Sequence, residues 1–238
     1  MKICLIPARS GSKRIKNKNL TNLDGKPIIF YSIDAAINSK IFDKVIVTTD
    51  SEKIAKTARM FGAETPFIRP KKISNDTATD LDVLNHFVKF SKKNTIKIDY
   101  LCYLYPTAFL INKKILKNSF DVLKKNKNCQ KVFTICEFRH PIERALRFDK
   151  NKNIVFNDKK KIFTRTQDLP KFYYDAAQCY WYNLNIIKKL NKNTNLTTKG
   201  FVLDDLDFYD IDNKEDLKIA KKLKKMIEIN AKKTKNNK

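Results

Sequence analysis

The sequence contains no apolar run long enough for a membrane-spanning helix, and it has only two histidines, His86 and His140. We therefore expect no membrane span, and a His-rich metal site is excluded. Its five cysteines form no C-x-x-C pair, which favours buried, reduced thiols over a redox or metal motif. The first residues run directly into a strand-like segment and do not resemble a signal peptide. These features together predict a cytoplasmic protein.

Arginine is also scarce, because only eight of the 50 basic residues are arginines although the net charge is +25. Nucleic-acid-binding proteins usually concentrate arginine and aromatic residues on one face, or carry a recognisable module. Neither feature is visible, and lysines are spread along the chain and crowded into residues 218–238. We therefore predict no nucleic-acid partner, although the positive field would attract anionic substrates.

Strand-like and helix-like segments alternate along most of the chain. Strand-like runs occur at residues 3–6, 44–49, 100–105 and 132–136, with apolar residues at helical spacing between them. This order predicts an α/β fold: a doubly wound, mostly parallel sheet in three layers, with helices on both faces. In such a sheet the carboxyl ends of the strands meet at one edge, where ligands bind.

Residues 139–185 depart from this pattern. Two short strand-like segments, 145–148 and 154–156, precede an irregular aromatic stretch at 163–174 and a further strand at 178–182. An insertion with exposed aromatic residues is typical of a surface on which subunits pair.

The last part of the chain returns to the sheet pattern at residues 206–212, and a final helix is expected from about Lys214. We predict a single domain over residues 1–226. The Lys-rich residues 227–238 are expected to form a disordered tail.

The loop after the first strand combines cations, hydroxyls and small residues. Gly11 within it can take a positive φ without steric cost. This composition is typical of a polyphosphate cradle, although the P-loop motif G-x-x-x-x-G-K-[ST] is absent. A solvated basic turn is the alternative. The residues concerned are Arg9, Ser10, Gly11, Ser12, Lys13 and Lys18.

Asp210 and Asp212 flank Ile211 in a segment predicted to be extended. Side chains alternate in extended backbone, so both carboxylates would lie on the same side. Mg²⁺ prefers hard oxygen ligands of this kind. The alternative is that the pair ends a strand and caps the next helix.

Two further groups of polar residues are candidates for binding a ligand. Arg69 and residues 74–80 would either read a nucleobase or cap the following helix. Arg165 lies in a partly apolar aromatic stretch, which suits a bidentate hold on a carboxylate, and Gln178 is its expected partner.

Several of these motifs together resemble the acylneuraminate (CMP-sugar acid) cytidylyltransferase family. Within that family, residues 164–169 and 174–181 are most similar to the pseudaminic acid branch. Tyr105 stands where the sialic acid enzymes typically have Gln, and Ala176–Ala177 stands near their usual Asn-Gly. The motifs that carry the resemblance are Ile6–Arg14 with Lys18–Asn19, Val47–Asp50, Ile68–Pro70, Asp76–Ala78, Tyr105–Thr107 and Asp210–Asp212.

The resemblance implies a nucleotide-diphospho-sugar transferase-like fold and a Mg²⁺-dependent reaction of CTP with a nine-carbon 2-keto sugar acid. The products would be a CMP-sugar for cell-surface glycans and pyrophosphate. It also implies a homodimer, in which the insertion at 139–185 reaches the partner's active site. CMP-sialic or CMP-legionaminic acid synthesis is the nearest alternative, and a basic nucleic-acid-binding protein is a more distant one.

The resemblance also implies a role for each candidate residue. Arg9, Lys18 and Asp212 would be catalytic, and Asp210 with Asp212 would bind the metal. Tyr105, Arg165 and Gln178 would bind the sugar acid. The nucleotide would be held by Arg9, Ser10, Gly11, Ser12, Lys13, Lys18, Asn19, Arg69, Thr77 and Ala78.

Overall fold

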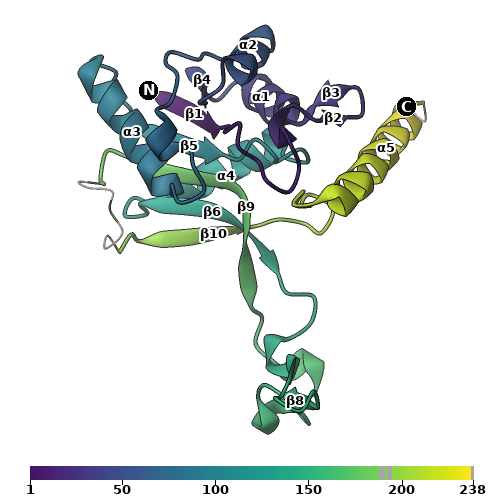
Figure 1. Ribbon diagram of the computed structural model, residues 1–238. Helices are drawn as coiled ribbons and strands as arrows, with labels where there is room; N and C mark the ends of the chain where they lie inside the picture. Colours follow the sequence, from purple (N-terminus) through teal and green to yellow (C-terminus); the bar gives the residue numbers. More distant parts are fainter. Residues whose placement is uncertain (188–190, 192–194, 237–238) are drawn as a thin grey trace.

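A six-stranded sheet forms the centre of the computed structural model, which describes residues 1–187, 191 and 195–236 (Figure 1). Strand β9 runs antiparallel to both of its neighbours, and the other pairs of neighbouring strands are parallel. The strands lie in the order β10 (Thr198–Val202), β6 (Lys131–Glu137), β9 (Tyr173–Asn183), β5 (Tyr100–Leu104), β1 (Lys2–Pro7) and β4 (Lys44–Thr48).

Helices cover both faces of this sheet. The helices are α1 (Ile28–Ser39), α2 (Glu52–Met60), α3 (Asp80–Lys93), α4 (Lys113–Lys125) and α5 (Lys214–Asn236). Side chains alternate along β1, so Cys4 and Ile6 pack with α1, α2 and α4, while Ile3 and Leu5 pack with α3 on the other face. The predicted three-layer, doubly wound α/β fold is confirmed.

Local sequence accounts for where the helices begin. Ser51 caps α2, because its Oγ accepts a hydrogen bond from the Ile54 amide at 3.4 Å. Thr79 and Asp82 form a capping box at the start of α3. Helix α1 follows Pro27 in the short strand pair β2 (Asn22–Leu23) and β3 (Lys26–Pro27).

The strand expected at residues 206–212 is not present, and the edge strand is β10 instead. Leu206 in this segment is exposed, Phe208 and Tyr209 are half-buried, and Ile211 is fully buried in a small cluster beside α5. The sequence of β10, TKGFV, does not show the apolar run or alternation that would predict a strand. Gly200 within it is required by packing, since a Cβ there would lie 2.3 Å from Ile135 Cδ1.

Helix α5 continues past the domain boundary expected at residue 226 and runs to Asn236. The tail expected from residue 227 therefore begins inside a helix, and residues 237–238 lie outside the described residues. Among the residues that the structure describes, no helix could cross a membrane.

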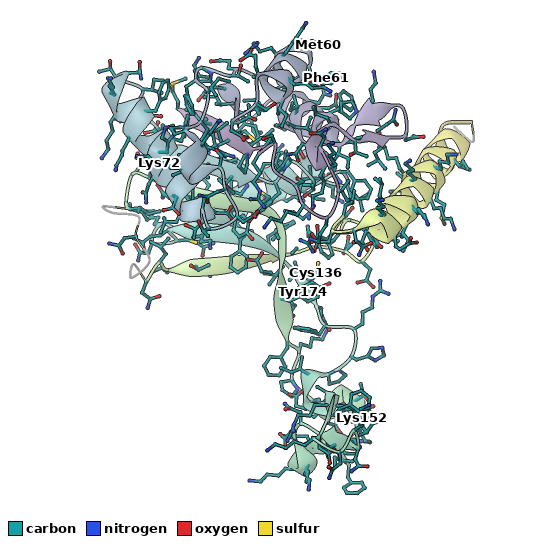
Figure 2. All side chains as sticks on the ribbon, in the orientation of Figure 1. Met60, Phe61, Lys72, Cys136, Lys152 and Tyr174 are labelled. Atoms are coloured by element: carbon teal, nitrogen blue, oxygen red, sulfur yellow. The ribbon has the colours of Figure 1, made fainter. Side chains whose placement is uncertain are left out.

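The insertion forms an arm that projects from the sheet (Figure 1). Strands β6 and β9 extend beyond the body, so that Cys136 and Tyr174 lie near the base of the arm and Lys152 near its far end (Figure 2). The hairpin of β7 (Leu146–Phe148) and β8 (Ile154–Phe156) confirms the two predicted short strands. The arm leaves from the end of β6, which is the sheet edge at which β1, β4 and β5 also end.

The short 3₁₀ segments lie in the connections and the arm. They are η1 (Lys18–Leu20), η2 (Lys71–Ile73), η3 (Ile142–Arg144), η4 (Lys159–Lys161) and η5 (Thr166–Asp168).

The five cysteines are free and buried, as predicted. His86 is part of α3, and its ring packs edge-on against Phe67 with the centroids 5.0 Å apart.

Candidate functional site

A cleft of about 300 Å³ lies at the carboxyl edge of the sheet. The loop after β1 forms one wall, the segment between η2 and α3 forms another, and Asp212 reaches in from the start of α5. The predicted candidates that line it are Arg9, Ser12, Lys13, Lys18, Asn19, Arg69, Ala78, Tyr105 and Asp212.

The loop after β1 is held in place by hydrogen bonds at both of its ends. Asp50, which follows β4, accepts from the Ser10 amide at 2.8 Å and from the Ser10 hydroxyl at 2.6 Å. Asn19 is buried, and its Nδ2 donates to the Arg9 carbonyl at 2.9 Å. The two ends of the segment that carries the cations are therefore anchored to buried or half-buried side chains.

Ser10 and Gly11 are not among the residues that line the cleft. Ser10 instead anchors the loop to Asp50. Gly11 does not adopt a positive φ, and a Cβ there would meet no heavy atom within 4 Å. The conformational freedom expected at Gly11 is therefore not used by the chain; the residue with a positive φ in this loop is Asn17, at 54°.

The loop meets the acidic segment through two cations. Arg14 NH2 lies 2.8 Å from Asp212 Oδ1, and Lys18 Nζ lies 3.5 Å from the same oxygen. Lys18 Nζ also donates a short hydrogen bond to the Ile211 carbonyl. The loop after β1 and the segment before α5 thus meet at Asp212.

Asp210 and Asp212 line a second cavity of about 490 Å³, next to the base of the arm. Ile211 between them is fully buried, and the carboxylates on either side of it both lie at this cavity. Partial desolvation, and then the neighbouring Asp212 carboxylate, raise the pKa of Asp210. The helix-capping role is taken by Asn213, whose Oδ1 accepts from the amides of Glu215 and Asp216 at 2.8 and 3.0 Å, while Asp216 accepts from the Asn213 amide at 2.8 Å.

The carboxylate pair fits a hard divalent cation only in part. A cation between Asp210 and Asp212 would relieve the mutual repulsion that raises the pKa of Asp210. Within the described residues, no group of three or more metal-ligating side chains is found. The chain would therefore supply two ligands, and the remainder would be water or phosphate oxygens, which is the usual manner of Mg²⁺.

Arg69 is the buried cation of the cleft, with an exposed fraction of 3%. Its Nε donates to Ser74 Oγ at 2.9 Å, but its NH1 is buried without a hydrogen-bond partner. Burial lowers the pKa of this guanidinium. An unpaired buried donor is costly, so NH1 is well placed to bind an acceptor on a ligand.

The helix-capping interpretation of residues 74–80 is confirmed at Thr79, and the nucleobase interpretation stays a prediction. Thr79 caps α3, while Asn75 Oδ1 accepts from the amides of Thr77 and Ala78 at 3.1 and 2.9 Å. Ala78 lines the cleft and Thr77 does not.

The three predicted sugar-binding residues lie in different places. Tyr105 lines the cleft, and its hydroxyl donates a short hydrogen bond to Asp80. Gln178 is buried in β9, where its Nε2 donates to the Ala176 carbonyl at 3.2 Å and its Oε1 has no partner. Arg165 is exposed in the arm and pairs with Asp168 at 2.8 Å. Within one chain, Arg165 and Gln178 therefore do not form the expected pair.

Three carboxylates of the site were given no role from the sequence: Asp50, Asp76 and Asp80. Topology does predict Asp50 at this edge, because Pro7 and Thr48 end neighbouring parallel strands, but it does not predict the hydrogen bonds of Asp50 to Ser10. Asp76 and Asp80 belong to the polar run at 74–80, but the sequence does not show that Asp76 pairs with Arg9 or that Asp80 accepts from Tyr103 and Tyr105.

A mostly parallel sheet with a cationic loop, a buried arginine whose NH1 has no partner, and a carboxylate pair at one edge defines an α/β protein suited to nucleotides and polyphosphates. Residues 3–235 match the Cytidylyltransferase family. The chain therefore belongs to the cytidylyltransferase family and is a nucleotidyltransferase.

Relatives of the chain include two enzymes of Campylobacter jejuni subsp. jejuni serotype O:2. A pseudaminic acid cytidylyltransferase is 37% identical over 94% of this chain and 96% of its own. A CMP-N,N'-diacetyllegionaminic acid synthase is 31% identical over 92% of each. The solved structure of CMP:2-keto-3-deoxy-manno-octonic acid synthetase complexed with CTP shares the fold, with a TM-score of 0.66 and 16% identity over 94% of this chain and 98% of that one.

Proposed function

We propose that the protein transfers cytidine monophosphate from CTP to pseudaminic acid, giving CMP-pseudaminic acid and pyrophosphate, with Mg²⁺ bound at Asp210 and Asp212. The observation that carries the proposal is the meeting of the cationic loop with Asp212 in one cleft. The identity to the pseudaminic acid enzyme over nearly the whole of both chains supports the choice of sugar.

The reaction replaces one phosphate ester bond by another. The anomeric hydroxyl of the sugar acid attacks the α-phosphorus and loses its proton, and the bond from the α-phosphorus to the bridging oxygen of pyrophosphate breaks. Such a displacement depends on positioning and on neutralising charge more than on covalent help from the protein. Residues that hold the phosphates rigidly would therefore contribute most of the catalysis.

The side chains of the cleft would divide this work. Arg9, Lys13 and Lys18 would hold the triphosphate and offset charge on the departing pyrophosphate. Arg69 NH1 and the Ala78 backbone would bind the cytidine. A bound Mg²⁺ would polarise the phosphate oxygens.

Selection of the sugar would begin at Tyr105, whose hydroxyl is held by Asp80 and whose amide donates to the Gln178 carbonyl at 2.9 Å. Gln178 would act through this backbone contact, since its buried side chain does not reach the cleft.

We expect Arg165 to act in a neighbouring subunit of a homodimer. The arm leaves the sheet at the same edge as the cleft, and its apolar side chains are exposed, including Phe148, Ile154 and Phe163. Exposed apolar surface of this kind is typical of a subunit contact. The cytoplasmic location stays a prediction.

The proposal is tested by measuring pyrophosphate release from CTP with pseudaminic, legionaminic and sialic acids, each with Mg²⁺ and with EDTA. Turnover with pseudaminic acid that exceeds the other two, and that EDTA abolishes, is expected. Faster turnover with another acid would reassign the substrate, and full activity in EDTA would remove the metal.

The dimer is tested by mixing inactive variants. Arg165→Ala subunits and Asp212→Asn subunits should each be inactive alone. If Arg165 serves the partner's cleft, a mixture contains hybrid dimers with one complete site and regains activity. If Arg165 served its own cleft, the hybrid would have no complete site and the mixture would stay inactive.

A further inference from the structure

Asp76 lies against the phosphate-binding wall of the cleft. Arg9 NH1 donates to Asp76 Oδ1 at 2.7 Å, and Lys13 Nζ lies 2.5 Å from Asp76 Oδ2. One carboxylate therefore bridges two cations with one oxygen to each, as a phosphate group would. The other two cations of the loop that contact a carboxylate, Arg14 and Lys18, are paired with Asp212.

A more highly charged anion can displace this contact. The Lys13 side chain is 80% exposed and that of Asp76 is 41% exposed, so water screens the pairs and makes each of them weak. Hydrogen bonds from Lys13 and then from Arg9 lower the pKa of the Asp76 carboxyl, so it is ionised at neutral pH and competes with every anion. A triphosphate or pyrophosphate offers several more charged oxygens than one carboxylate.

The backbone around Asp76 is fixed without its side chain. Asn75 Oδ1 accepts from the Thr77 and Ala78 amides, and Thr79 caps α3. Rotation of the Asp76 side chain can therefore break both ion pairs while the segment that carries Ala78 stays in place.

We infer that Asp76 is a displaceable competitor for the polyphosphate site, alternating with phosphate groups as the partner of Arg9 and Lys13. It weakens the binding of every anion at this wall, and it would help pyrophosphate to leave by restoring the two ion pairs. The inference rests on the proposed function only for the identity of the natural anion.

The experiment is calorimetric titration of inorganic pyrophosphate into the full-length protein, without nucleotide or sugar. Asp76→Asn and Asp76→Ala should bind pyrophosphate about three- to tenfold more tightly than the natural protein, because two exposed ion pairs no longer have to be broken. The matched control is Glu64→Gln, which makes the same change of charge. Glu64 pairs at 2.9 Å with Lys44, which begins β4 at the opposite edge of the sheet.

Unchanged or weaker binding by both Asp76 variants would overturn the inference, since Asp76 would then position the cations instead of competing for them. An equal increase in pyrophosphate affinity in Glu64→Gln would also overturn it, because the effect would then come from net charge alone. In a protein that already carries Arg9→Ala, the increase in affinity caused by Asp76→Asn should be smaller. An undiminished increase there would show that Asp76 does not act through its contact with Arg9. Tighter pyrophosphate binding without turnover of CTP would refute the proposed function and leave this inference standing.

Discussion

The body of the molecule and its arm are stabilised in different ways. In the body, Trp181 is fully buried, stacks on Phe42 with ring centroids 5.2 Å apart, and donates to Ser119 Oγ at 3.0 Å. In the arm, the hairpin turn is held by local hydrogen bonds to Asp149, and Phe163 is 95% exposed. A lone hairpin is only marginally stable in water. The difference shows that the fold around the cleft rests on a buried core, whereas the arm is held mainly by local contacts and leaves apolar side chains exposed.

The largest expected effect is a loss of turnover in Asp212→Asn without a matching loss of thermal stability. Asp212→Asn removes a charge from the cleft where Arg14 and Lys18 converge. If it holds the metal, turnover should fall about 10³-fold, which corresponds to roughly 4 kcal/mol of activation free energy. The melting temperature should change by only a few degrees, because the exposed ion pairs of Asp212 contribute little to stability. Pyrophosphate release and thermal unfolding measure the two quantities.

Glu215→Gln is the matched control, since Glu215 is an exposed carboxylate of α5 that pairs only with Lys218 among the contacts described. It should leave turnover unchanged. A natural rate in Asp212→Asn would remove the metal assignment.

The second prediction compares the same truncation in the two regions. Phe87→Ala empties a fully buried position between α3 and the sheet, and it should lower the free energy of unfolding by about 3–5 kcal/mol. Phe163→Ala in the arm should change it by less than about 0.5 kcal/mol for the monomer. Urea unfolding at low protein concentration makes the comparison, and sedimentation at high concentration shows whether Phe163→Ala weakens a dimer. A large loss of stability in the Phe163 monomer would show that the arm packs on its own body.

The contrast also explains what could be predicted from the sequence. Apolar periodicity found β1, β4, β5 and the four helices that pack on the sheet, because burial on a regular face dictates that pattern. It missed β10, whose residues Thr198–Val202 are mostly exposed at the edge of the sheet. It placed a strand at 206–212, where an irregular segment buries Ile211 and leaves Leu206 exposed.

Residues that line the cleft could be predicted where one loop carries several of them, and less well where contacts join distant segments. The cationic loop and Asp212 were found as motifs, and the structure brings them together. The pairing of Asp76 with Arg9 spans 67 residues, and no local pattern encodes it. The expected partnership of Arg165 and Gln178 failed within one chain, because sequence order does not show that the arm carries Arg165 away from the sheet.

A third prediction concerns the contact between the loop after β1 and the segment before α5. Lys18→Ala removes the ammonium that bonds to the Ile211 carbonyl and faces Asp212. The KM for CTP should rise about tenfold, or roughly 1.4 kcal/mol, with little change in thermal stability. Lys16→Ala is the control, because Lys16 is an exposed cation of the same loop that is not among the residues lining the cleft. An unchanged response to CTP in Lys18→Ala, or an equal rise in Lys16→Ala, would count against a specific role.

The smallest effects come from two residues with positive φ, Ala177 in β9 at 48° and Lys152 in the arm turn at 64°. Glycine at either position removes a steric cost of about 1–2 kcal/mol but adds entropy to the unfolded chain worth about 0.4–1 kcal/mol, so each Gly variant should raise stability by about 0–1.6 kcal/mol.

Valine at the same two positions should distinguish the regions. Ala177 lies in a bulge whose neighbour Gln178 accepts from the Tyr105 amide at 2.9 Å, so Ala177→Val must strain the sheet beside the cleft and should cost about 1–3 kcal/mol in urea unfolding. Lys152→Val should cost less than about 0.5 kcal/mol, because the exposed hairpin can open locally while the sheet stays folded. Equal losses at the two positions would mean that the arm unfolds together with the body, and the two regions would then not differ in how they are stabilised.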